Sequence, residues 1–260
     1  VQRQMARAGI AEPSVRAIFL SHHHLDHVAD LGPLLWTHWT FGRGVLTVVG
    51  PVGTRELVEG LVQASAPITL AGYPTTGPPQ VSLTDKLQVI EIPVDLAAPQ
   101  EVFRDDAITV EAVGVDHFQT PPSISLEAMP QAVAYRVTAA DRTIVYTGDS
   151  GPSPRLEALI AGADLLVTEV VELDAIARQL FSAPQGSPAA VREAITQGMA
   201  VNHLTPGEIG RMAASGEVGE VLLTHFVPSP ETVEDRSVYA RQIGAHYSGP
   251  VTLADDLGRY

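Results

Sequence analysis

The sequence of 260 residues contains no cysteine and only one lysine, Lys86. Without cysteine the chain has no disulfide, no thiolate zinc site and no cysteine nucleophile, although this absence leaves the redox compartment open. No apolar run is long enough to span a membrane, and the first seven residues lack the apolar core of a signal peptide. We therefore expect a soluble protein with no membrane partner, located in the cytoplasm or, after removal of a signal, in the periplasm or outside the cell.

Positive charge is scarce in this chain. Sixteen basic residues stand against 30 acidic ones, which gives a formal net charge of −14 at pH 7. A surface of this charge repels a phosphate backbone, so the composition weighs against tight non-specific binding of nucleic acid.

The remaining composition is that of an ordinary globular protein, with 45% hydrophobic and 18% charged residues. Strand-like and helix-like segments are mixed along the chain, and no repeat, low-complexity tract or linker separates them. We therefore expect a single domain of residues 1–260, in which helices cover a sheet.

A run of metal-binding residue types, Ser21-His22-His23-His24-Leu25-Asp26-His27, directly follows an apolar, strand-like stretch. Imidazole is the commonest protein ligand of transition metals, and carboxylate is a good partner for it. His22 and His24 are two residues apart, so on an extended segment both can reach one ion. Asp26 and His27 follow after a turn and can face a second ion. A purification tag would lie at a terminus and would not follow a buried strand.

Three later residues of the same kind also follow predicted strands. They are His117 after strand 108–115, Asp149 after strand 143–146, and His225 after strand 221–224. A single histidine after a strand is more often structural. Three such strand ends, together with the histidine run, favour a site for two metal ions at one edge of a sheet.

In this order the residues resemble the metallo-β-lactamase superfamily over essentially the whole chain. The resemblance implies an α/β fold, a four-layer αββα sandwich with the metals in a cleft at the edge of the sheets. It also implies which residues bind metal: His22, His24 and His117 would hold one zinc ion, Asp26, His27 and His225 would hold the other, and Asp149 would bridge the two. The cofactors would be two Zn²⁺ ions, with Mn²⁺ or iron as alternatives. A water between two divalent ions loses a proton near neutral pH and becomes a nucleophile.

The segment 202–208, Asn-His-Leu-Thr-Pro-Gly-Glu, narrows this resemblance. Thr205 as N-cap with Glu208 three residues later predicts a capping box, which would hold His203 just outside a helix. The segment resembles ribonuclease Z and its phosphodiesterase and arylsulfatase-like relatives. The resemblance implies that His203 is a proton donor and Glu169 its partner, with Asp26 as a further catalytic residue. As alternatives, His203 only packs or caps, and Glu169 is a buried structural carboxylate.

Two departures from this family pattern affect the expected substrate and fold. The chain has no Lys/Arg-rich arm and is strongly acidic, so we expect tRNA to be an unlikely partner. Only 17 residues precede Ile18, whereas several strands precede the histidine run in relatives. We therefore expect the N-terminal strands to be missing or supplied by another segment.

Two further segments carry local predictions. Residues 54–64 are expected to form a helix, with Thr54 available as its N-cap. Residues 181–190, rich in proline, serine and glycine, are expected to form a loop or lid.

The leading functional hypothesis is a dinuclear zinc hydrolase in which a metal-bridging hydroxide attacks an ester of a small molecule. A phosphodiester is the first choice of substrate, followed by a sulfate ester or a related ester. One alternative is a lactonase or carboxylesterase of the same fold, for which Tyr73 or Tyr135 is a candidate site tyrosine. An alternative of another class is a metal-binding partner protein without catalysis. A homodimer is also expected from the resemblance.

Overall fold

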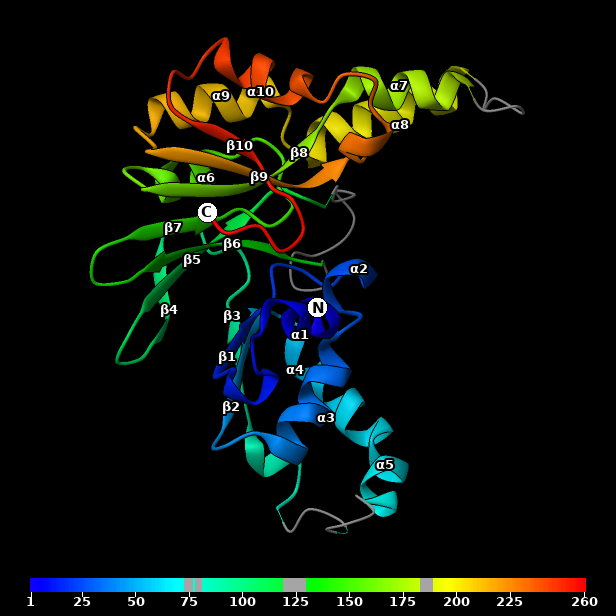
Figure 1. Cartoon of the computed structure of the whole chain (residues 1–260), viewed down its shortest axis with the longest axis vertical. Helices are drawn as coiled ribbons and strands as arrows, with labels where there is room; N and C mark the ends of the chain where they lie inside the picture. The colour runs from blue at the N-terminus through cyan, green and yellow to red at the C-terminus, as the bar shows by residue number, and fades with distance from the viewer. Residues whose placement is uncertain (73–76, 78–80, 119–129, 183–188) are drawn as a thin grey trace. The chain divides into compact units, whose positions relative to one another are not determined.

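The computed structural model describes residues 1–72, 77, 81–118, 130–182 and 189–260. By its contacts the chain divides into two compact units, which we describe separately (Figure 1). Unit 1 consists of residues 1–94 and 255–260, and unit 2 consists of residues 95–254. The prediction of one domain over 1–260 stays a prediction.

Unit 1 contains a parallel three-stranded sheet in the order β1-β2-β3. Its strands and helices are β1 (Ala17–Phe19), β2 (Leu46–Pro51), β3 (Leu87–Ile92), α1 (Gln2–Ala8), α2 (Leu25–Val28), α3 (Leu31–Phe41), α4 (Thr54–Ala64) and α5 (Ala66–Ala71), with short 3₁₀ turns at Glu12–Ser14 and Thr84–Lys86. Parallel strands need crossover connections, and α3 and α4 lie within those crossovers.

The core of unit 1 forms where α3 and α4 cover this sheet. Leu31, Leu35 and Trp39 recur at helical spacing along α3 and are buried. They pack with Val58 of α4 and with Val48 of the central strand β2. All residues of β2 are buried, as expected for the middle strand of a parallel sheet.

The helix expected over 54–64 is confirmed, but the expectation that Thr54 is its N-cap is wrong. The N-cap of α4 is Gly53, whose φ of +98° lies in the left-handed region that favours glycine. Thr54 is therefore the first helical residue, and its hydroxyl is committed to other contacts.

Unit 2 contains a mixed seven-stranded sheet in the order β10-β9-β8-β7-β6-β5-β4. The strands are β4 (Gln100–Arg104), β5 (Thr109–Val115), β6 (Ala132–Thr138), β7 (Thr143–Tyr146), β8 (Leu165–Val171), β9 (Glu220–Val227) and β10 (Val251–Leu253). The helices are α6 (Pro154–Ile160), α7 (Leu173–Ser182), α8 (Ala189–Asn202), α9 (Pro206–Ser215) and α10 (Ser237–Gly244), with a 3₁₀ turn at Pro230–Thr232.

Strand direction in unit 2 brings four strand ends to one edge of the sheet. β7, β8 and β9 pair in parallel, and β6 is antiparallel to both β5 and β7. β5 therefore runs in the same direction as β7, β8 and β9, so the carboxyl ends of all four strands lie at the same edge. Polar residues that follow these strands are placed close together by the topology.

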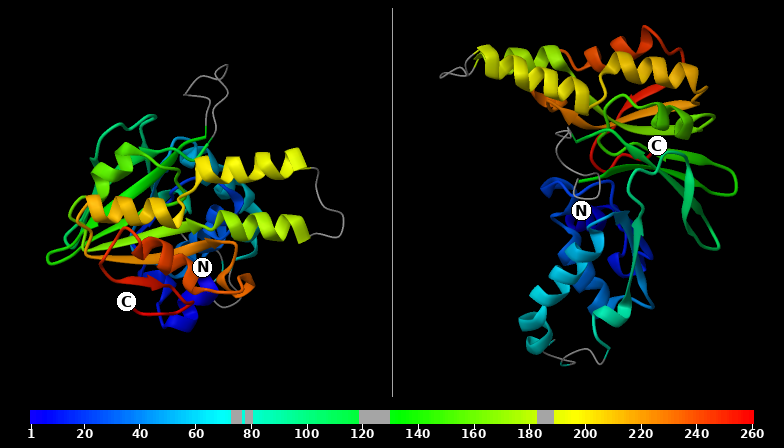
Figure 2. Two further views of the ribbon diagram at one scale, coloured as in Figure 1. Left: turned by 90° about the horizontal axis from the view of Figure 1, so that it is seen from above. Right: turned by 180° about the vertical axis from the view of Figure 1, so that it is seen from behind.

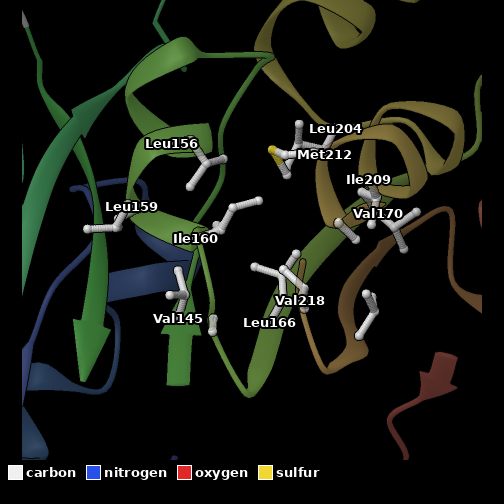
Figure 3. Packing of buried hydrophobic residues seen from close by; sticks show 14 of the residues in the cluster. Val145, Leu156, Leu159, Ile160, Leu166, Val170, Leu204, Ile209, Met212 and Val218 are labelled. Carbon is white, nitrogen blue, oxygen red and sulfur yellow. The ribbon is translucent and has the colours of Figure 1, made fainter. Parts of the chain in front are cut away.

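The core of unit 2 lies between this sheet and the helices α6, α9 and α10. Figure 3 shows Leu156, Leu159 and Ile160 of α6 packed near Val145 of β7 and Leu166 of β8. α9 contributes Ile209, Met212 and Ala213 to the same cluster, and α10 contributes Tyr239 and Ile243. This apolar contact fixes the strands whose ends carry the polar residues.

Helices α7 and α8 lie side by side and join β8 to the segment before α9 (Figure 2). The loop predicted at 181–190 is described only at its two ends, where residues 181–182 finish α7 and residues 189–190 begin α8. Among the described residues, none of the helices is both long and apolar enough to cross a bilayer.

We expect Ile160→Ala to destabilise unit 2 by about 2–5 kcal/mol, because the side chain is fully buried and its removal leaves a cavity. Ile195→Ala on α8 is the matched control, since Ile195 is 39% exposed, and it should change stability by about 0.5 kcal/mol or less. Hydrogen exchange of the β7 and β8 amides measures the local stability. Equal effects of the two substitutions would contradict this packing.

Candidate metal centre

The histidine run of unit 1 forms a compact group of imidazoles, with His22 and His24 between β1 and α2 and His27 within α2. His22 Nε2 lies 3.0 Å from His24 Nδ1, and the rings of His22 and His27 have centroids 4.0 Å apart. His22 Nδ1 lies 3.2 Å from the Ser21 hydroxyl. Asp26 Oδ2 lies 3.4 Å from His27 Nε2. Unit 1 thus brings together the four predicted ligands of the run.

His23, between two predicted ligands, makes a different contact. Its Nε2 lies 2.9 Å from the hydroxyl of Thr54 at the start of α4. Burial lowers the pKa of His23, and the carboxylate of Glu91 opposes that shift. The ring is therefore held against α4.

In unit 2, His117 and Asp149 follow the ends of β5 and β7, as the topology requires. Gly148, with a φ of +58°, turns the chain directly before Asp149. His117 Nδ1 donates to the backbone carbonyl of Asn202 at 2.8 Å, which fixes the tautomer and the direction of the ring. Ligand atoms of His117, Asp149 and His203 all lie within 4.8 Å of one another.

His225 was expected to follow a strand that ends at residue 224, but β9 continues to Val227, so His225 lies within the strand. It lies at a β-bulge opposite β8. The register moves from Thr168 opposite Leu223 to Val170 opposite Phe226, so Thr224 and His225 together oppose Glu169. His225 has a φ of +43°, an uncommon value for a residue other than glycine. Bulges re-aim side chains and are common beside active sites. Here His225 Nδ1 lies 3.7 Å from Asp149 Oδ1.

Glu169 is a buried carboxylate that is 1% exposed and joins two segments of unit 2. Its Oε1 accepts a hydrogen bond from the Ser150 backbone N–H at 2.7 Å, and its Oε2 lies 2.5 Å from His203 Nδ1. Burial raises the pKa of Glu169 well above its usual range, and the nearby charge of Asp149 raises it further. The contact that the sequence suggested between Glu169 and His203 is therefore present in the structure.

The predicted capping box fixes the segment that carries His203. The Glu208 N–H donates to the Thr205 hydroxyl, and the Thr205 N–H donates to the Glu208 carboxylate at 2.9 Å. Leu204, between His203 and this cap, is fully buried. The capping box and the buried side chain of Leu204 together hold His203 just outside α9.

The donor sets fit zinc, which takes imidazole nitrogen and carboxylate oxygen in tetrahedral sites. Two such nitrogens on one ion lie about 3.3 Å apart, close to the distance between His22 Nε2 and His24 Nδ1. The hydrogen bond from His117 Nδ1 to a carbonyl is typical of a metal ligand, because it leaves Nε2 for coordination.

Each unit brings its own predicted ligands together. The assignment of seven ligands to two ions combines residues of both units and stays a prediction, as do the catalytic roles of His203, Glu169 and Asp26. Of the two tyrosines suggested for a lactonase, Tyr73 lies outside the described residues. Tyr135 lies on β6, where burial and the neighbouring Tyr146 raise its pKa.

Sequence reasoning missed several groups that support the site. The carbonyl of Asn202 and the N–H of Ser150 are backbone atoms, so residue type gives no signal for them. The hydroxyl of Thr54 was interpreted as a helix cap. Only its contact with His23 relates it to the histidine run.

Comparison with known proteins identifies relatives over the whole chain. The family model described as "Beta-lactamase superfamily domain" matches residues 2–226. The chain is 33% identical over 262 residues to "Ribonuclease Z" of Mycobacterium sp. (strain KMS), covering 100% of this chain and 82% of that protein.

Solved structures share the fold at lower identity. Human tRNase Z, short form, superimposes with a TM-score of 0.62 at 20% identity, covering 99% of this chain and 83% of that one. Zn²⁺-bound PqqB from Methylobacterium extorquens superimposes with a TM-score of 0.59 at 19% identity, covering 93% of this chain and 71% of that one. Together with the family model, these similarities confirm the predicted α/β fold of the metallo-β-lactamase type.

The prediction that tRNA is an unlikely partner is wrong. Relatives over the full length of this chain are named ribonuclease Z, and a structural neighbour is a tRNase Z. The prediction depended on net charge, which is an average over the whole molecule. Unit 2 contains 21 acidic and nine basic residues, whereas unit 1 contains nine and seven, so the acidic excess is concentrated in unit 2. Net charge therefore does not describe the local field that a substrate meets.

We expect Glu169→Gln to change the pH dependence of stability in metal-free protein. Because the pKa of Glu169 is raised, the folded state holds this proton more tightly than the unfolded state does. Its stabilising contribution is present below the ordinary value of 4.5 and is lost as pH rises towards the folded pKa. Chemical unfolding in chelator should therefore show wild type losing stability relative to Glu169→Gln as the pH rises above 4.5.

The exposed carboxylate Glu157 of α6 provides the control, because Glu157→Gln removes a charge without changing a buried group. A wild-type protein that gained stability relative to Glu169→Gln over this range would show that the contact with His203 outweighs burial.

Proposed function

Because this chain belongs to the metallo-β-lactamase superfamily of hydrolases, we propose that it is a metal-dependent phosphodiesterase of the ribonuclease Z type. Its substrate class would be RNA, with tRNA as the first candidate. The observation that carries this proposal is the 33% identity to a ribonuclease Z along the whole chain. The contact between His203 and Glu169 supports it, because it supplies a proton donor with a fixed orientation.

The residues that would hold the metals are the predicted ligand set, namely His22, His24, Asp26 and His27 of unit 1 and His117, Asp149 and His225 of unit 2. When bound, two divalent ions, Zn²⁺ first with Mn²⁺ or iron as alternatives, would lower the pKa of a coordinated water and offset the charge that develops on the phosphate.

His203 would protonate the oxygen that leaves. Cleavage of an RNA phosphodiester expels a ribose alkoxide, which is a poor leaving group without a proton. His203 Nδ1 is hydrogen-bonded to Glu169, so Nε2 would be the nitrogen that gives up the proton. Such general acid catalysis commonly contributes about 10²–10⁴-fold in rate.

Glu169 would act through His203. Its carboxylate fixes the tautomer of the imidazole and, when ionised, stabilises the imidazolium form that donates the proton. The Ser150 N–H holds the other carboxylate oxygen, so the pair keeps one orientation. Glu169 is therefore proposed as a positioning residue for the proton donor.

The charge distribution is compatible with an RNA substrate. Unit 1 is nearly neutral in formal charge, with nine acidic and seven basic residues. The predicted ligands include only two carboxylates, because the others are histidines. Bound divalent cations would therefore more than offset the negative charge of the ligand set. RNA phosphates would then meet a locally less negative surface than the chain average implies.

We expect the zinc-loaded protein to cleave tRNA transcripts that carry additional nucleotides at either end. Chelator and the His117→Ala variant should each abolish this cleavage, because both remove metal. Denaturing gels measure it, with bis-p-nitrophenyl phosphate and an aryl sulfate as small-molecule comparisons. Hydrolysis of the aryl sulfate without any RNA cleavage would overturn the proposed substrate class.

We expect His203→Ala to slow RNA cleavage by about 10²–10⁴-fold, since the ribose oxygen needs a proton. The same variant should change hydrolysis of bis-p-nitrophenyl phosphate much less, because p-nitrophenolate leaves without one. His246→Ala is the control histidine, with no assigned role at the site. Steady-state rates on both substrates check this split, and equal losses on the two would contradict the acid role.

A further inference from the structure

His23 is the one residue within the span His22–His24 that is not a predicted ligand, and a hydrogen bond fixes its ring. We infer that Thr54, through its hydrogen bond to His23, is a positioning residue that sets the directions of His22 and His24 towards a metal ion. The inference rests on the proposed function only in that these two histidines bind metal. It does not depend on the substrate.

The hydroxyl of Thr54 has a defined role in this contact. Thr54 Oγ1 donates its proton to the Pro51 carbonyl at 2.7 Å. The same oxygen lies 2.9 Å from His23 Nε2, and with its own proton already committed it acts there as the acceptor. His23 therefore carries a proton on Nε2 and donates it to Thr54. The bond has one direction and needs a hydroxyl at position 54.

The residues around Thr54 pack closely against its hydroxyl and against the His23 ring. Thr54 is fully buried. A Cβ at Gly50 would lie 2.4 Å from Thr54 Oγ1, so a larger residue on β2 would displace the hydroxyl. A Cβ at Gly53 would lie 3.4 Å from His23 Cε1, so the ring lies in contact with the backbone that precedes α4.

The start of α4, on which Thr54 stands, is itself held in place. Glu91 of β3 accepts hydrogen bonds from the Gly53 N–H at 2.8 Å and from the Arg55 N–H at 3.0 Å. These are backbone donors that a helix start leaves unsatisfied, and a carboxylate there is stabilised by the helix dipole. The Arg55 guanidinium also donates to the Val89 carbonyl of β3 at 2.9 Å. These contacts fix the start of α4 against β3, and with it the position of the Thr54 hydroxyl.

Fixing His23 determines where its neighbours point. His24 has an extended backbone, with φ −62° and ψ 148°, and successive side chains of an extended segment point to opposite sides. With His23 held against α4, His22 and His24 are directed to the other side, where their nitrogens lie 3.0 Å apart. A pair of ligands that is already aligned loses less conformational freedom when an ion binds.

The test compares Thr54→Val, which removes the hydroxyl at nearly constant volume, with Thr54→Ser, which keeps it. Zinc affinity of the full chain is measured by competition with a chromophoric chelator, at a temperature where circular dichroism shows the metal-free variants folded. We expect Thr54→Val to bind zinc about tenfold more weakly or worse, the loss typical when a group that orients ligands is removed. Thr54→Ser should stay close to wild type, because the acceptor oxygen remains.

A second pair at position 23 covers the case in which Thr54→Val fails to fold. The amide nitrogen of glutamine can donate to Thr54 as Nε2 does, so His23→Gln should retain zinc affinity, whereas His23→Leu should lose it about tenfold. Wild-type zinc affinity in both Thr54→Val and His23→Leu would overturn the inference, even if their metal-free melting temperatures fall. Zinc affinity that drops as expected in a protein that cleaves no RNA would refute the proposed function and leave this inference standing.

Discussion

A single buried carboxylate, Glu169, connects the segments of unit 2 that carry chemistry. It lies in the middle of β8, accepts the N–H of Ser150 after β7, and contacts His203 before α9. The bulge in β9 places His225 opposite the same residue. A buried charge is costly unless it is hydrogen-bonded, so this carboxylate keeps its partners at fixed positions. The geometry of the candidate site in unit 2 depends on that requirement.

In unit 1, other polar groups hold the histidine run in one conformation. A histidine run after a short strand has many conformations in which its rings diverge. The hydroxyl of Thr54 holds one ring aside, and the carboxylate of Glu91 holds the helix start that carries this hydroxyl. In both units a polar group outside the predicted ligand set holds a segment that carries predicted site residues. Such supporting contacts commonly decide how precisely a site is formed.

Electrostatic reasoning from the whole chain was the weakest step from sequence to function. A formal charge of −14 argued against tRNA, yet relatives along the whole chain are ribonucleases Z. The charge lies mainly in unit 2, and a substrate responds to the local field at its own contacts. Net charge describes solubility and long-range association better than it describes what a site accepts.

The sequence by itself determined the residue types of the candidate site. His22, His24, Asp26 and His27 are neighbours in the chain, so local spacing was enough to predict them as ligands. The capping box at Thr205 was equally local, and the structure contains it as predicted. His117, Asp149 and His225 could be suggested because each follows a run of apolar residues. Strand direction places His117 and Asp149 beyond the ends of β5 and β7, whereas His225 lies within β9.

Only the tertiary structure decided how these residues are held. The bulge at His225 depends on the register between β8 and β9, and the carbonyl that orients His117 belongs to Asn202, 85 residues away. Helices α7 and α8 were not predicted, and residues 181–182 and 189–190 of the loop expected over 181–190 belong to them. Spacing predicts Thr54 as a helix cap, whereas the fold places its hydroxyl against His23 and makes Gly53 the N-cap. Spacing reports which side chains the chain offers, whereas backbone partners and register arise from contacts between segments that are distant in sequence.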